Sequence, residues 1–150
     1  MNKIKLIALC LIVTFSIFSS GCQSDGFMNV YEAYKQEYFG LCESIITDTN
    51  LISRDTAYKT SERLQTSESN QKLERLDELL DQMKQHEGTN DVYIGMREMR
   101  MREYEMILDL KEVYGKWGAL TEQEKIEVTS QYGVINGLYS LEIDERKKKD

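Results

Sequence analysis

Apolar residues recur at alternating spacings of four and three through the middle of this 150-residue chain. The series is Val92, Met96, Met99, Glu103, Met106, Leu110, Val113 and Trp117, with Glu103 its one polar member. This spacing places all eight on one side of an α-helix of the bundle or coiled-coil type. The sequence therefore predicts a long helix over residues 92–117, weakened at its end by Gly115 and Gly118.

Three further segments show helical periodicity. Residues 27–46 carry an apolar stripe made of Phe27, Tyr31, Tyr34, Tyr38, Leu41 and Ile45. Residues 71–85 carry a second stripe made of Leu73, Leu76, Leu80 and Met83. A capping box at Thr121 and Glu124 begins the last segment. Its apolar face consists of Val128, Tyr132, Ile135, Tyr139 and Ile143.

Two parts of the chain are less regular. Nine of the 23 residues from Thr47 to Ser69 are Ser or Thr, which favour caps and turns. We expect a loop around residues 48–53, followed by one weak helical turn. We also expect residues 47–69 to be the least ordered part of the domain. Asn136-Gly137 is a hairpin signal between two apolar pairs, so residues 131–141 have a helix and a hairpin interpretation; the capping box favours the helix.

These patterns together predict an all-α fold. We expect a small antiparallel bundle over residues 27–150, built from three long helices and one weaker element.

The N-terminus has the pattern of a secretory signal. Lys3 and Lys5 precede the apolar segment Leu6–Phe18, and small residues follow in Ser19-Ser20-Gly21-Cys22. Thirteen residues are too few to span a bilayer, which takes about 20. The alternative is an uncleaved N-terminal anchor in which Cys22 has no role.

The cysteine directly after Ser-Gly makes this segment resemble the signal peptide of bacterial lipoproteins, although Ser19 stands where that family usually has Leu. The resemblance implies that residues 1–21 are removed and that Cys22 receives lipid. It also implies a location on the extracytoplasmic face of the cell membrane. In organisation the chain is similar to small surface lipoproteins of bacilli and their mobile elements, some of which block phage or plasmid entry.

The net charge of the chain and the length of its N-terminal tether limit the kinds of partner that we expect. The formal net charge of −7 argues against nucleic acid, whose binding relies on Lys and Arg. Residues 22–26 form a short tether, in which four extended residues reach about 14 Å. We therefore expect membrane lipid at Cys22 and a membrane-proximal protein as partners.

Several side chains have two interpretations. Tyr31, Tyr34 and Tyr38 pack in the core or contact the membrane or a partner. The basic run Arg146, Lys147, Lys148 and Lys149 complements a helix dipole or contacts anionic headgroups. Cys42 is expected to be a buried hydrophobic residue. Glu103 is expected to fix the bundle register, with a partner from another helix because Arg100 and Arg102 lie off its stripe.

Four methionines fall within eleven residues: Met96, Met99, Met101 and Met106. Thioethers suit Cu(I), but all except Met101 lie on the predicted helix stripe, where methionine is ordinary packing. The sequence carries no catalytic motif and no cofactor motif that we recognise, and its one histidine has no second one to pair with. We therefore expect a non-catalytic protein-binding module beside the membrane; the alternative is a carrier of a small ligand or copper.

Overall fold

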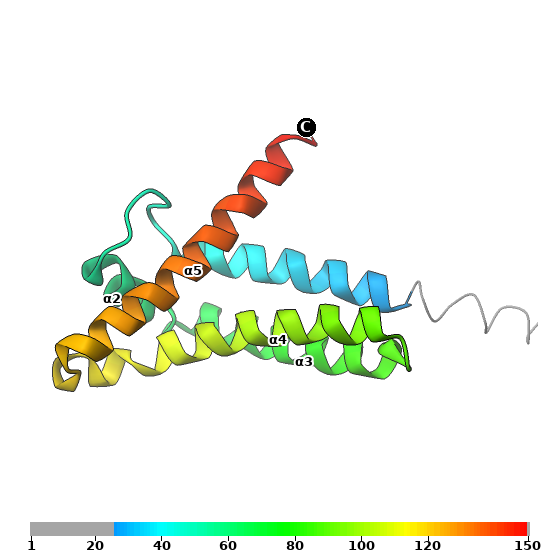
Figure 1. The fold of residues 1–150 in the computed structure, drawn as a ribbon, viewed down its shortest axis with the longest axis horizontal. Coiled ribbons are helices and arrows are strands. Elements are labelled where there is room, and N and C mark those ends of the chain that lie inside the picture. Colours follow the sequence, from blue (N-terminus) through cyan, green and yellow to red (C-terminus); the bar gives the residue numbers. More distant parts are fainter. Residues whose placement is uncertain (1–25, 150) are drawn as a thin grey trace, which may run out of the picture.

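The computed structural model describes residues 26–149, and these residues contain helices and no strand (Figure 1). An unlabelled helix, called helix 26–45 after its residues, comes first and is drawn in blue to cyan. It is followed by α2 (Arg54–Arg63), α3 (Ser67–Glu87), α4 (Asp91–Glu112), the 3-10 helix η1 (Tyr114–Ala119) and α5 (Glu122–Lys147). The all-α prediction is confirmed, and the structure has one long helix more than expected.

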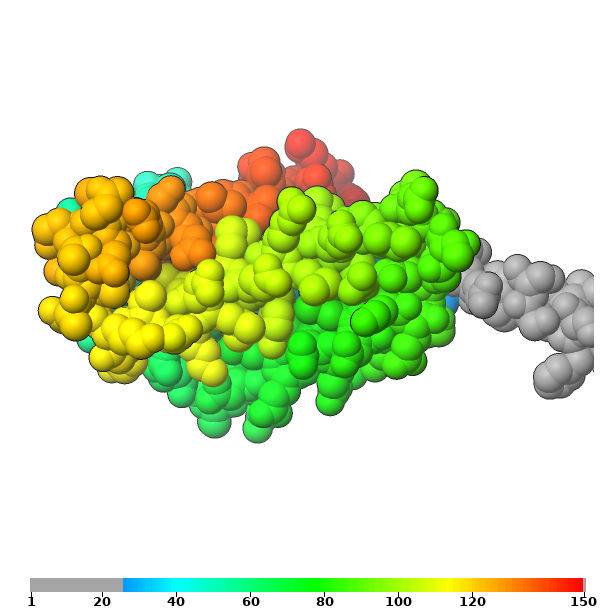
Figure 2. Space-filling model, turned by 60° about the horizontal axis from the view of Figure 1, so that its bottom comes forward, coloured from blue at the N-terminus to red at the C-terminus, as the bar shows by residue number. Residues whose placement is uncertain are grey.

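The helices pack around one core. α3 and α4 form an antiparallel pair joined by a turn at Gly88, whose φ is 57°. Helix 26–45 lies along this pair, and α5 crosses it obliquely, so that the last turns of α5 diverge from the other helices (Figure 1). Figure 2 shows α3 and α4, in green to yellow, covering one side of the molecule, with the end of α5 set back behind them.

The Ser/Thr-rich stretch is more helical than the sequence predicts. The expected loop is present over residues 46–53, but α2 follows it, and α3 begins at Ser67 rather than near Gln71. The hydroxyl groups explain the difference, because they cap these helices. Ser53 forms a capping box at the start of α2, and Thr66 caps α3.

The apolar series predicted to form the buried side of α4 is buried only in part. Glu103 and Leu110 are buried, but Ile107 takes the place expected for Met106. At the N-terminal end Val92 is 67% exposed and Met99 is 49% exposed. The physical reason is the oblique course of α5, whose end does not cover this half of α4.

The helix interpretation of residues 131–141 is confirmed, since α5 continues through them. The capping box at Thr121 and Glu124 is present as predicted. Ile52 of the loop packs beside Gly133 of α5, where a Cβ would meet it at 3.4 Å, an ordinary van der Waals distance. None of the helices within residues 26–149 combines the length and the apolar character needed to cross a membrane.

Candidate functional site: a wedge between α4, α5 and helix 26–45

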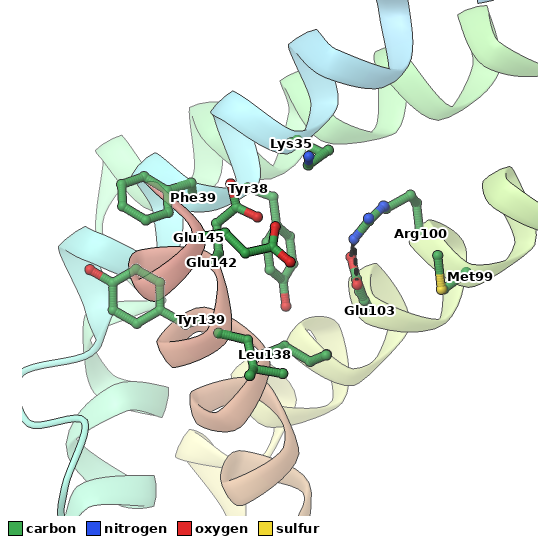
Figure 3. Close-up of a pocket in the computed structure, with 11 residues that line it drawn as sticks. Lys35, Tyr38, Phe39, Met99, Arg100, Glu103, Leu138, Tyr139, Glu142 and Glu145 are labelled. Carbon is green, nitrogen blue, oxygen red and sulfur yellow. Dashed lines mark hydrogen bonds and ion pairs between the residues drawn. The ribbon is translucent and has the colours of Figure 1, made fainter. Parts of the chain in front are cut away.

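The divergence of α5 leaves a cavity of about 220 Å³ between three helices, which we call the wedge (Figure 3). Helix 26–45 forms its floor, and α4 and α5 form its walls. Its main lining residues are Lys35, Tyr38, Phe39, Met99, Arg100, Glu103, Leu138, Leu141, Glu142 and Glu145.

The long side chain of Arg146 connects the end of α5 to helix 26–45. Its guanidinium carbon lies 3.7 Å from the ring centre of Phe39, and its Nη1 donates to Gln36 Oε1 at 3.0 Å. Tyr139 also packs against the Phe39 ring, with a centroid distance of 5.3 Å. These contacts hold the C-terminal part of α5 to helix 26–45. The wedge is therefore part of the folded structure.

A network of polar groups closes the α4 wall. Arg100 Nη1 donates to both carboxylate oxygens of Glu103, at 2.6 and 2.8 Å, and Arg100 Nη2 donates to the Tyr31 hydroxyl at 2.7 Å. The Tyr34 hydroxyl donates to the backbone oxygen of Arg100 at 3.0 Å. Arg100 thus joins α4 to helix 26–45 through two tyrosines. The expectation that Glu103 pairs with another helix is wrong, because Arg100 reaches it within the same helix.

Burial is the largest influence on the pKa of Glu103, whose side chain is 5% exposed. Loss of water raises the pKa of its carboxyl group, and the opposing effect of Arg100 does not cancel this increase. Repulsion from Glu142 across the wedge acts in the same direction as burial.

Tyr38 brings a polar group into the wedge without a partner. Its side chain is 8% exposed, and its hydroxyl has no hydrogen-bond partner among the described residues. Figure 3 shows the hydroxyl directed into the space between Leu138 and Glu103. Burial raises the pKa of this hydroxyl well above its ordinary value, so it remains protonated.

The wedge walls also carry uncovered apolar groups. Leu141 of α5 is 63% exposed and Met99 of α4 is 49% exposed. Exposed apolar groups that face one another across a hollow are typical of binding grooves.

The three predicted contact tyrosines are not on the surface. Tyr31, Tyr34 and Tyr38 are all buried in the described domain, as their core interpretation expects. Of the basic run, Arg146 is bound to helix 26–45, whereas Lys147, Lys148 and Lys149 are exposed at the end of α5.

The methionines do not gather at one place. Met99 lines the wedge, whereas Met101 lines a second hollow between α3 and α4, where its sulfur accepts a hydrogen bond from Arg97 at 3.2 Å. Met96 and Met106 pack against the core. Within residues 26–149 no group of three or more His, Cys, Asp or Glu side chains is placed to hold a metal ion.

Cys22 and residues 1–25 lie outside the described residues, so the lipidation site has no structural counterpart here. Cys42 is buried as expected, and burial raises the pKa of its thiol to about 12. Comparisons with protein-family models, curated proteins and solved structures found no match for this chain.

Sequence reasoning did not find the α5 side of the wedge. Leu138 and Leu141 stand off the predicted core stripe, three residues apart on the same side of the helix. That spacing is the signal that indicates a second apolar side of α5, whose residues line the wedge.

Proposed function

We propose that this chain is a lipid-anchored lipoprotein on the outer face of a bacterial cell membrane, where it binds a membrane-proximal protein without catalysing a reaction. The observation that supports the binding role is the wedge, a cavity with exposed apolar side chains on two helices, whereas the anchor rests on the N-terminal sequence pattern. A groove of this kind suits an amphipathic helix that inserts apolar side chains. The partner is then held by shape and apolar contact.

The place where the chain enters the domain supports this geometry. Helix 26–45 begins beside the turn between α3 and α4, and a Cβ on Gly26 would come within 3.0 Å of His86 in α3. From its crossing with helix 26–45, α5 runs toward this end of the molecule (Figure 1). A lipid on Cys22 would therefore bring the start of helix 26–45 and the end of α5, two helices that line the wedge, toward the membrane.

The anchoring step is tested by substituting Cys22→Ser in cells. The proposal expects an uncleaved precursor that keeps residues 1–21, detected by intact-mass measurement and by its altered membrane fractionation. A matched Cys42→Ser variant controls for loss of a thiol elsewhere in the chain. An unchanged mass and an unchanged fractionation for Cys22→Ser would contradict the lipoprotein proposal.

A further inference from the structure

Three carboxylates from two helices converge on the wedge. Glu103 lies on α4, and Glu142 and Glu145 lie on α5 (Figure 3). Glu103 pairs with Arg100, and Glu142 pairs with Arg146 at 3.0 Å. Glu145 has no ion-pair partner among the described residues. Lys35 is the remaining cation that lines the cavity, so carboxylates outnumber cations there by three to two.

Tyr38 gives a second and independent indication of a ligand. Its buried hydroxyl points into the same cavity and accepts no hydrogen bond from any residue within 26–149. A buried polar group without a hydrogen bond is destabilising unless something satisfies it. The oxygen lone pairs can accept a hydrogen bond from a cationic donor that enters the wedge.

We infer that the wedge holds the side chain of a lysine, presented by an apolar segment of a partner protein. The aliphatic stem would lie between Leu138 and Met99, and its ammonium group would donate to the Glu145 carboxylate and the Tyr38 hydroxyl. A lysine suits this place because its stem tolerates an apolar wall while its charged end needs acceptors.

Charge selects against other occupants. An anion would meet three carboxylates, and a second copy of this chain would bring a net charge of −7 toward a domain of the same sign. A segment with one positive side chain among apolar ones matches both the exposed Leu141 and the acidic lining. This inference rests on the proposed function and adds the chemistry of the partner.

The inference is tested on the lipid-bearing chain in nanodiscs, with labelled methionine methyl groups observed by NMR. The probes are two helical peptides of about 14 residues. One has a single lysine between leucines, and the other has norleucine at that position. The lysine peptide should shift the Met99 methyl signal in a saturable way and bind more tightly than the norleucine peptide. The buried Met83 in α3 is the reference signal.

Two substitutions locate the ammonium group. Glu145→Gln should weaken binding of the lysine peptide about three- to tenfold, whereas the neighbouring Asp144→Asn should not, because Asp144 lies outside the wedge. Tyr38→Phe should weaken binding to a similar degree without lowering the melting temperature, because it removes an unpartnered buried hydroxyl. A loss of binding equal for Glu145→Gln and Asp144→Asn would overturn the inference, since only net charge would then matter.

Other outcomes separate this inference from the proposed function. If both peptides shift Met99 equally, the lysine inference is wrong while docking in the wedge stands. If neither peptide shifts Met99, the wedge is not a docking site and both fail. Tighter binding of n-pentylammonium than of the lysine peptide would overturn the inference in favour of a free amine ligand.

Discussion

At the scale of single residues, Arg100 organises more of the structure than its sequence position indicates. It binds Glu103, contacts Tyr31 through its hydroxyl and its ring, and offers its backbone oxygen to Tyr34. Helical periodicity placed Glu103 on the buried side of α4 correctly. It could not identify the partner, because a long arginine side chain reaches inward from a position off the stripe.

The raised pKa of Glu103 gives a pH prediction. Its folded-state pKa lies above the ordinary value, so the stability that protonation provides is present below the ordinary pKa and is lost as pH rises through the folded-state value. Relative to Glu103→Gln, the natural chain should therefore lose stability as pH rises above the ordinary pKa of a glutamate carboxyl group, about 4.3. Denaturant unfolding of both chains at several pH values measures this difference. A difference that is flat, or that changes in favour of the natural chain, would contradict the assignment of burial as the dominant effect.

Cys42 gives a prediction about reactivity. Its thiol is buried and has a pKa of about 12, and the thiolate is the reactive form. Alkylation by iodoacetamide at neutral pH should be slow in the folded chain and fast in denaturant. The Cys42→Ser variant serves as the blank in a mass-spectrometric assay. Rapid labelling without denaturant would show that the core around Cys42 opens locally.

At the scale of helices, the capping signals were reliable and the packing direction was not. The capping box at Thr121 predicted the start of α5, and hydrogen bonds of this kind are local in sequence. The apolar series on α4 shows periodicity but not which helix covers it. Which residues of α4 are covered depends on how α5 crosses helix 26–45. That crossing includes the contact of Arg146 with Phe39, two residues that lie 107 positions apart in the chain.

The contact of Arg146 can be tested by truncation. Arg146→Ala removes its interactions with Phe39 and Gln36 and should cost about 1–2 kcal/mol of unfolding free energy. It should also speed amide hydrogen exchange in the last turns of α5. Lys147→Ala, which changes an exposed residue, should stay within about 0.5 kcal/mol of the natural chain. Equal effects of the two substitutions would contradict the role assigned to Arg146.

At the scale of the whole molecule, the helical class could be predicted from the sequence, but the wedge could not. The all-α class followed from periodicity in four segments, whereas the wedge is a consequence of three helices that do not fill the space between them. The residue spacing within a single helix does not indicate such a gap between helices. The two apolar residues Leu138 and Leu141 show only that α5 has a second apolar side, without showing what it faces.

The central claim is that the wedge binds a membrane-proximal protein while the chain is anchored at Cys22. A photocrosslinking residue placed at Leu141, in the wedge, or at Ile126, which is 49% exposed near the other end of α5, tests this in cells. The account predicts one cross-linked membrane protein from position 141 and none from position 126. It also predicts loss of the product when residues 1–22 are exchanged for a secretory signal that is removed without lipid attachment. Equal cross-linking from both positions, or a product that persists in the secreted form, would contradict it.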